Sequence, residues 1–236
     1  MKAVILAAGR GSRISKVTSS IPKPMIKYNG KPILEHNIDL CKQNGVRDIF
    51  INTSHLASKI TGYFGDGRDR GVNIQYSFEE ELLGTASALI NFRSFLMDEP
   101  FYVLYGDNYS EYDLKLLSTK AASVDSIAVI GFHSREDVSS SGVAEFNSDG
   151  QIHKFIEKPN PGETDSHWVN AGIYYLKPSI FDAIPNKYGD FGRDIFPMLL
   201  RNNVPLYGVC SEINVKAFDT PEMLIQNTKT YYDAKK

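Results

Sequence analysis

The sequence is short of cysteine and has no run of basic residues, and both shortages exclude classes of protein. Cys41 and Cys210 are the only cysteines, too few and too far apart for a disulfide framework or a four-ligand zinc site, and they fit a reducing compartment. Lysine and arginine number 26 against 28 for aspartate and glutamate, which gives a formal net charge of −2. The chain therefore carries no electrostatic signature of non-specific binding to nucleic acid or to an anionic membrane.

Long hydrophobic runs are also missing. No apolar segment approaches the roughly 20 residues that a membrane-spanning helix needs. The apolar stretch after Met1 is short, is broken at Arg10 and leads into further basic residues, unlike a signal peptide. Hydrophobic residues still make up 42% of the 236 positions, enough for a buried core. We therefore expect a soluble, cytoplasmic protein with neither membrane nor nucleic-acid partners.

The first half of the chain alternates short apolar runs with amphipathic segments. This pattern is typical of a parallel sheet that helices cover on both faces. The predicted strands are residues 2–6, 47–51, 72–76 and 101–105, and the predicted helices are residues 33–43, 56–64 and 85–92.

After about residue 124 the rhythm changes to closely spaced strand-like segments, which favours antiparallel pairing. These segments are 126–132, 142–146, 152–156 and 169–175, followed by helical segments at 178–183 and 193–201, a strand at 204–209 and a helix at 221–234. The predicted fold class is α/β, with a Rossmann-like, mixed and mainly parallel central sheet flanked by helices and additional antiparallel strands in the second half. Because we find no linker or internal repeat, we expect one domain over residues 1–236.

A glycine-rich loop directly follows the first predicted strand, where residues 6–13 read Leu-Ala-Ala-Gly-Arg-Gly-Ser-Arg. Small residues let backbone N–H groups approach a phosphate, and Arg13 is placed to neutralise its charge. Ile14 stands where a dinucleotide-binding loop has its third glycine, and no Gly-Lys-Ser/Thr triplet is present, so neither that loop nor a P-loop fits. On these residues alone, an ordinary strand-to-loop turn stays open.

Lys23 lies between Pro22 and Pro24. The two prolines disfavour a helix and hold the lysine on a stiff extended segment. A lysine of this kind is usually a solvated loop charge, but its place close behind a glycine-rich loop favours a phosphate-binding role.

The chain resembles the sugar-1-phosphate nucleotidyltransferases, which join an NTP and a sugar 1-phosphate into an NDP-sugar and pyrophosphate. The family's opening signature is matched by residues 6–13, 22–25 and 30–33, with Ser12 in place of the usual threonine. Further matches follow in order at 83–86, 106–107, 155–159, 170–174 and 219–222. Within the family, the chain resembles the mannose- and heptose-1-phosphate guanylyltransferases.

The resemblance implies roles for particular residues. Arg13 and Lys23 would be catalytic, and Asp107 and Asp219 would hold Mg²⁺. The implied nucleotide-binding residues, in a first half of about residues 1–124, are Leu6, Ala7, Ala8, Gly9, Gly11, Ser12, Glu79, Gly84 and Thr85. The implied sugar-phosphate-binding residues, mainly from a second half of about residues 125–236, are Asn108, Glu157, Lys158, Asn170 and Gly172. Association of identical subunits would be usual for the family.

The residues themselves support some of these roles and leave alternatives to others. Asp107 follows a predicted central strand, so it should emerge at the sheet edge where open α/β sheets bind ligands, and carboxylates suit Mg²⁺. Asp219 meets Thr220 directly, without the two residues that relatives often have there, and an N-cap role for either residue stays open. Glu157 and Lys158 could instead form a strand-end ion pair.

Other features bear on what surrounds the site. Gly172 would leave room for a pyranose ring. Residues 190–194 have the pattern of an ordinary helix start. The five histidines, His36, His55, His133, His153 and His167, lie outside every motif, and we interpret them as surface or strand residues.

Glu79 gives the only indication of the nucleobase. Several uridylyl- and thymidylyltransferases have glutamine at the matching position, and a carboxylate that only accepts hydrogen bonds suits the N1–H and N2–H₂ of guanine. We therefore favour GTP with mannose or heptose 1-phosphate. A three-glutamate run is more often a solvated approach to a helix. UTP, dTTP or CTP with another sugar phosphate, a phosphocholine-type reaction, and a non-catalytic nucleotide-sugar-binding protein stay as alternatives.

Overall fold

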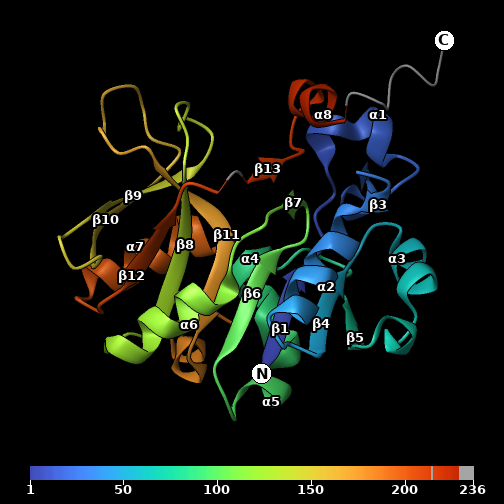
Figure 1. Cartoon of the computed structure of the whole chain (residues 1–236), viewed down its shortest axis with the longest axis horizontal. Helices are drawn as coiled ribbons and strands as arrows, with labels where there is room; N and C mark the ends of the chain where they lie inside the picture. The colour runs from blue at the N-terminus through green and yellow to red at the C-terminus, as the bar shows by residue number, and fades with distance from the viewer. Residues whose placement is uncertain (214, 229–236) are drawn as a thin grey trace.

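A nine-stranded sheet runs through both halves of the chain in the computed structural model, which describes residues 1–213 and 215–228 (Figure 1). Its main path has the order β10-β9-β11-β6-β1-β4-β5, and β8 pairs with β11 and with β12. The strands are β1 (Lys2–Leu6), β4 (Asp48–Thr53), β5 (Asn73–Phe78), β6 (Phe101–Tyr105), β8 (Ala128–Ser134), β9 (Gly142–Phe146), β10 (Ile152–Glu157), β11 (Trp168–Leu176) and β12 (Tyr207–Ser211).

The predicted change from parallel to antiparallel pairing is confirmed. Strand β1 lies between β4 and β6 and runs parallel to both, and β5 continues the parallel part beyond β4. Strand β11 is antiparallel to β6, β8 and β9, and β10 is antiparallel to β9. The carboxyl ends of β1 and β6 therefore lie side by side, so the loops that follow these strands leave the sheet together.

Helices cover both faces of the sheet because side chains alternate along its buried strands. Ala3 and Ile5 of β1 pack in one core cluster with α2 (Ile33–Gln43), α3 (Ala57–Phe64) and α6 (Leu114–Ser123). Val4 and Leu6 face the opposite way and pack with α4 (Gly84–Ser87), α5 (Arg93–Leu96) and α7 (Phe196–Arg201). Within the described residues, no helix combines the length and the apolar character that crossing a membrane requires.

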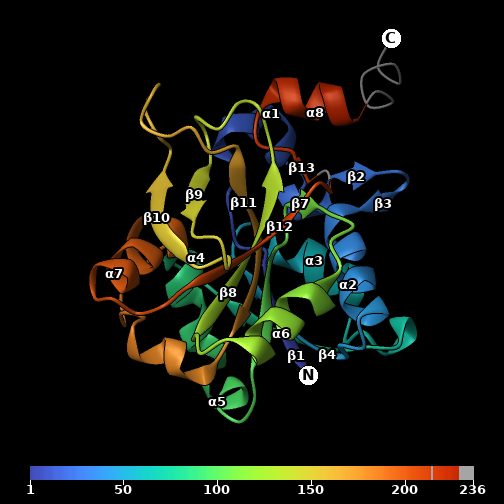
Figure 2. The same cartoon turned by 60° about the vertical axis from the view of Figure 1, so that its left-hand side comes forward.

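A third, smaller apolar cluster joins segments from both ends of the chain above the carboxyl ends of β1 and β6. Its buried members are Ile14, Ile26, Ile33, Phe218 and Leu224. They bring together the 3₁₀ turn Ser12–Ile14 that precedes α1 (Ser15–Thr18), the β2–β3 hairpin (Lys27–Tyr28 and Lys31–Pro32) with the start of α2, the ribbon of β7 (Asn108–Tyr109) with β13 (Lys216–Ala217), and α8 (Pro221–Asn227) (Figure 2). The segment before α8 is thereby held against the first half of the chain.

The differences from the predicted elements have local causes. The strand expected at 204–209 is β12 instead, displaced toward the C-terminus past Pro205, which has no N–H to donate, and it runs parallel to β8. Helix α6 was not predicted, although Asp113 caps it by accepting a hydrogen bond from the N–H of Lys115. The segment 85–92 divides into α4 and a 3₁₀ turn. The closing helix includes α8, and residues 229–234 of that prediction lie outside the described residues.

Gly172 occupies a tight position in β11, where the pairing with β8 shifts register between Asn170 and Tyr174. Its φ is +68°, and a Cβ there would lie 2.7 Å from the Cγ of Tyr105. The side-chain oxygen of Asn170 accepts a hydrogen bond of 2.9 Å from the N–H of Gly172, which fixes this irregular backbone.

Replacing Gly172 with alanine should lower the free energy of unfolding by about 1–3 kcal/mol, because the added methyl group overlaps Tyr105 and the positive φ is strained. Gly62→Ala is the matched control, since Gly62 lies in α3 and nothing stands within 4 Å of its added Cβ. Urea unfolding of both variants checks this. Equal unfolding free energies for Gly172→Ala and the wild type would contradict the close contact.

Candidate functional site

An open cavity of about 390 Å³ lies where the carboxyl ends of β1 and β6 face β8 and β10. Both halves of the chain contribute to its walls. The predicted site residues that line it are Leu6, Ala7, Ala8, Gly9, Arg13, Lys23, Glu79, Gly84, Thr85, Asp107, Asn108, Glu157, Lys158, Asn170 and Asp219. The structure therefore brings most of the predicted residues into one place.

Three predicted site residues, Gly11, Ser12 and Gly172, are not among the residues that line the cavity. Gly11 has a φ of +62°, and a Cβ there would lie 2.7 Å from the Thr18 side chain, so glycine permits the turn of the loop. At Gly172, any side chain would overlap the ring of Tyr105, which itself lines the cavity. Gly172 therefore has a packing role beside the cavity, and the room it would leave for a sugar ring stays a prediction.

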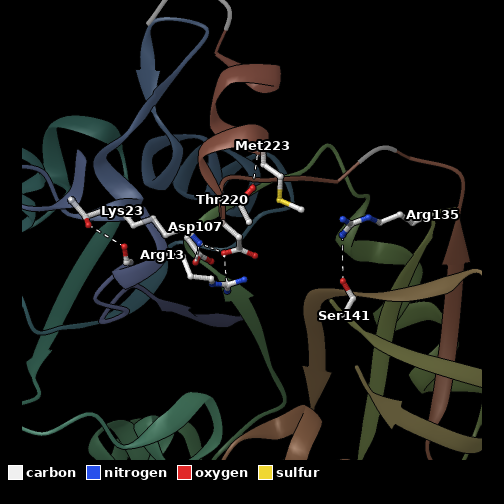
Figure 3. Close-up of polar contacts among 10 residues, drawn as sticks. Arg13, Lys23, Asp107, Arg135, Ser141, Thr220 and Met223 are labelled. Atoms are coloured by element: carbon white, nitrogen blue, oxygen red, sulfur yellow. Dashed lines mark hydrogen bonds and ion pairs between the residues drawn. The ribbon is translucent and has the colours of Figure 1, made fainter. Parts of the chain in front are cut away.

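Lys23, Asp107 and Asp219 form the most concentrated group of charges in the cavity (Figure 3). The Nζ of Lys23 donates a hydrogen bond of 2.5 Å to Asp107 and another to Asp219. Lys23 is only 4% exposed, so the solvated-loop interpretation is wrong. Lys23 begins a 3₁₀ turn at Lys23–Met25 after the extended Pro22, so the prediction of an extended segment at the lysine is wrong. Asp107 follows β6, and Asp219 precedes α8.

The contacts of this group favour the charged forms of Lys23 and Asp219. Burial alone would lower the pKa of Lys23, but the two carboxylates outweigh it and raise that pKa. Burial would raise the pKa of Asp219, and the Lys23 ammonium, aided by Arg13 and Arg135, lowers it instead. Arg13 lies 3.6 Å from Asp219. Two carboxylates thus face one ammonium and one guanidinium at this point.

The positions of Asp107 and Asp219 also suit a divalent metal ion. Both carboxylates contact one ammonium, so they lie close enough to share a single cation. Mg²⁺ is usually held by one or two carboxylates, with water and substrate phosphates completing its oxygen ligands. Within residues 1–213 and 215–228, no third His, Cys, Asp or Glu joins a metal-binding group. Asp107 and Asp219 thus fit an ion that also binds phosphate.

A hydrogen-bonded chain connects the glycine-rich loop with Glu79. The N–H of Ala7 donates to the Asn52 side chain at 2.7 Å, and the amide of Asn52 donates to Glu79 at 2.8 Å. The N–H of Leu83 donates to the other carboxylate oxygen at 3.1 Å. Glu79 is 4% exposed, so the solvated interpretation of this glutamate is wrong. Asn52, at the end of β4, is a cavity residue that the sequence analysis did not identify.

Glu157 presents its carboxylate to the cavity from the end of β10. A Cβ on Gly142 or Gly192 would lie 2.9 or 2.6 Å from its Oε2, so two glycines make room for this group. Burial, followed by the nearby Asp190, raises the pKa of Glu157. Among the described residues it forms no ion pair with Lys158, so the structure does not support the strand-end pair.

Lys158 follows Glu157 with a left-handed backbone, at a φ of +56°. This conformation is energetically unfavourable for a residue with a side chain, and such backbone strain is concentrated at functional sites. The N–H of Lys158 donates to the carbonyl of Ser141 at 3.0 Å, which holds the turn in place.

Two predicted helix starts are confirmed. Asp190 accepts hydrogen bonds from the N–H groups of Gly192 and Arg193. It also accepts one from the Thr85 hydroxyl at 2.9 Å, which joins α4 to this turn. Thr220 caps α8 by accepting from the N–H of Met223, whereas Asp219 is directed at Lys23.

His133 and Arg135 line the cavity outside every motif that the sequence analysis used. His133 lies in β8, as a strand residue, and it is 6% exposed. Its Nδ1 has no hydrogen-bond partner among the described residues. Burial, followed by the charge of Arg135, lowers its pKa to about 4. No local pattern marks either residue, because the pairing of β8 with β11 places them here.

His133 should make the fold sensitive to acid. Its pKa falls from 6.5 to about 4 on folding, so the unfolded chain binds a proton that the folded chain excludes between these values. Stability is therefore lost as the pH falls from about 7 to 4, by roughly 3 kcal/mol from this group. His133→Gln should remove that part of the loss. Urea unfolding across this pH range measures it, and parallel stability curves for variant and wild type would contradict it.

Comparison with known proteins identifies relatives over most of the chain. The sequence profile of the family described as Nucleotidyl transferase matches residues 2–217. A UTP–glucose-1-phosphate uridylyltransferase from Synechocystis is 40% identical over 223 residues, covering 89% of this chain and 58% of the relative. The mannose-1-phosphate guanylyltransferase catalytic subunit beta of Drosophila melanogaster is 33% identical over 199 residues, covering 83% of this chain and 53% of the relative. The chain thus spans a little over half the length of these relatives.

A solved structure supports the fold over the full length. HddC from Yersinia pseudotuberculosis, complexed with GMP-PN, superimposes with a TM-score of 0.79 at 26% identity, and the match covers 98% of this chain and 99% of that one. Since the family profile spans both walls of the cavity, the chain belongs to the nucleotidyl transferase family, among relatives named as sugar-1-phosphate nucleotidyltransferases.

Proposed function

We propose that this chain transfers a nucleotidyl group from an NTP to a sugar 1-phosphate and releases pyrophosphate. The observation that supports the proposal most strongly is the shared cavity. The glycine-rich loop and the group of Lys23, Asp107 and Asp219 line one side of it, and Glu157 and Lys158 line the other. Two anionic substrates could therefore meet between them.

On the nucleotide side, the loop backbone at residues 7–9 would approach the phosphates of the NTP, with Arg13 and Lys23 neutralising their charge. Asp107 and Asp219 would hold Mg²⁺. That ion, when bound, would neutralise phosphate charge at the same point. Lys23 now contacts both acids, so it is already next to the position where the phosphates would lie.

On the sugar side, the roles follow from groups that have few partners inside the protein. Glu157 accepts no hydrogen bond from a described residue and can accept them from sugar hydroxyls. Lys158 can bind the sugar's phosphate. The amide of Asn170 is already engaged with the Tyr174 hydroxyl at 2.8 Å and with Gly172, so we assign Asn170 to support the wall.

The chemistry needs alignment more than acid–base catalysis. A phosphate oxygen of the sugar 1-phosphate attacks the α-phosphorus in line, a new P–O bond forms, and the bond from the α-phosphorus to the pyrophosphate oxygen breaks. A phosphate monoester has its second pKa at about 6, so the attacking oxygen is already deprotonated near neutral pH. His133, which burial keeps neutral, is not required as a base. Positive charge and position supply the rate enhancement.

GTP with mannose or heptose 1-phosphate is the pair that we propose first. Each carboxylate oxygen of Glu79 accepts one hydrogen bond from the protein and has a second lone pair available, which suits the donors of guanine. The Drosophila relative is named as a guanylyltransferase, and HddC was solved with GMP-PN. UTP with glucose 1-phosphate is the second candidate, because the Synechocystis relative at 40% identity carries that name.

A matrix of four NTPs against mannose, heptose, glucose and N-acetylglucosamine 1-phosphates, read by pyrophosphate release, tests the function and its specificity. We expect release that requires both substrates, fastest with GTP and mannose or heptose 1-phosphate. Fastest release with UTP and glucose 1-phosphate would establish the second candidate. No release with any pair would contradict the proposed function.

Lys23→Ala and Asp107→Ala should each lower kcat by about a hundredfold or more. The first removes a positive charge that would stabilise the transition state, and the second removes a carboxylate that would hold Mg²⁺. Lys31→Ala is the matched control, since Lys31 is paired with Asp39 at the surface, 2.8 Å away and outside the cavity. Circular dichroism establishes that the variants fold. Near wild-type turnover by a folded Lys23→Ala or Asp107→Ala variant would remove that residue from the catalytic group.

A further inference from the structure

The positively charged side chains of the cavity differ in whether they form ion pairs within the protein. Arg13, Lys23, Arg135 and Lys158 line it, against the five carboxylates of Glu79, Asp107, Glu157, Asp190 and Asp219. Lys23 is bound to two acids, and Arg13 pairs with Asp219. Among the described residues, Arg135 and Lys158 form no ion pair with any carboxylate. In the described part of the chain, the cavity cations that form no ion pair, Arg135 and Lys158, therefore lie on the sugar side.

Ser141 holds these two residues near each other. Its hydroxyl accepts a hydrogen bond of 3.3 Å from Nη1 of Arg135, and its carbonyl accepts one of 3.0 Å from the N–H of Lys158. Ser141 directly precedes β9, whereas Arg135 follows β8 and Lys158 follows β10. The end of β8, the start of β9 and the end of β10 thus bring Arg135, Ser141 and Lys158 together.

Arg135 also faces the other wall of the cavity. Figure 3 shows its guanidinium directed from Ser141 toward the group that contains Asp107 and Arg13. An anion between the two walls would therefore meet Arg135 on one side and the nucleotide-binding residues on the other.

We propose that Arg135 binds the phosphate of the sugar 1-phosphate together with Lys158. A guanidinium has five N–H donors, so one bond to Ser141 leaves donors for a two-point contact with phosphate. The in-line reaction puts the attacking phosphate and the departing pyrophosphate on opposite sides of the α-phosphorus. Arg135 shares Ser141 with Lys158 and so lies on the side of the attacking phosphate. The proposal rests on the proposed function and adds a residue to it.

Steady-state kinetics of Arg135→Gln tests the assignment. We expect the KM for the sugar 1-phosphate to rise about tenfold or more, since a charge-assisted contact is lost, while the KM for the NTP stays within about twofold. Arg135→Lys should recover part of the loss because it restores the charge without the planar fork. Arg201→Gln, an exposed change at the end of α7 and outside the cavity, is the matched control and should leave both constants unchanged.

Several outcomes would overturn the assignment while leaving the proposed function intact. An active Arg135→Gln variant with an unchanged KM for the sugar 1-phosphate is one. A rise confined to the KM for the NTP is another, because it would place Arg135 on the nucleotide's phosphates. If the wild type turned over no substrate pair, the proposed function would fail separately. Calorimetric titration with mannose 1-phosphate would then still test Arg135, and equal affinities for wild type and Arg135→Gln would overturn the assignment.

Discussion

The contact of one buried ammonium with two carboxylates determines how this cavity is built. Lys23 binds Asp107, 84 positions away in the sequence, and Asp219, 196 positions away. An unpaired ammonium at 4% exposure would be costly, so burial of Lys23 requires both acids to converge on it. The apolar cluster around Phe218 supports that convergence, because it fastens the segment before α8 to the first half of the chain. Packing and electrostatics therefore reinforce the same arrangement.

The distribution of charge explains how such a cavity could accept two polyanions. Its acids are either bound to cations, as with Asp107 and Asp219, or hydrogen-bonded by the protein, as with Glu79. Glu157 is the exception, and it lies in a space left by two glycines, where sugar hydroxyls could reach it. The nucleotide and sugar walls thus differ in chemistry, which gives each substrate a preferred side.

The sequence predicted features that depend on local patterns, and it did not predict those that depend on long-range pairing. Alternating apolar runs located β1, β4 and β6, and from them followed the position of Asp107 at the sheet edge. The convergence of Asp219 with Asp107 came only from the family resemblance, since no local rule joins residues so distant. His133 and Arg135 stand in no motif and reach the cavity through the register of β8. The contact of Gly172 with Tyr105 was not predicted, because the two residues are distant in sequence.

Asp107 and Asp219 both contact Lys23, and we propose that a divalent ion would share this one cation site. Titration with Mn²⁺ in the presence of a non-hydrolysable NTP, followed by electron paramagnetic resonance, tests it most directly. Asp107→Asn and Asp219→Asn should each weaken Mn²⁺ binding about tenfold or more, because each removes a carboxylate ligand. Wild-type Mn²⁺ affinity in either variant would contradict the claim.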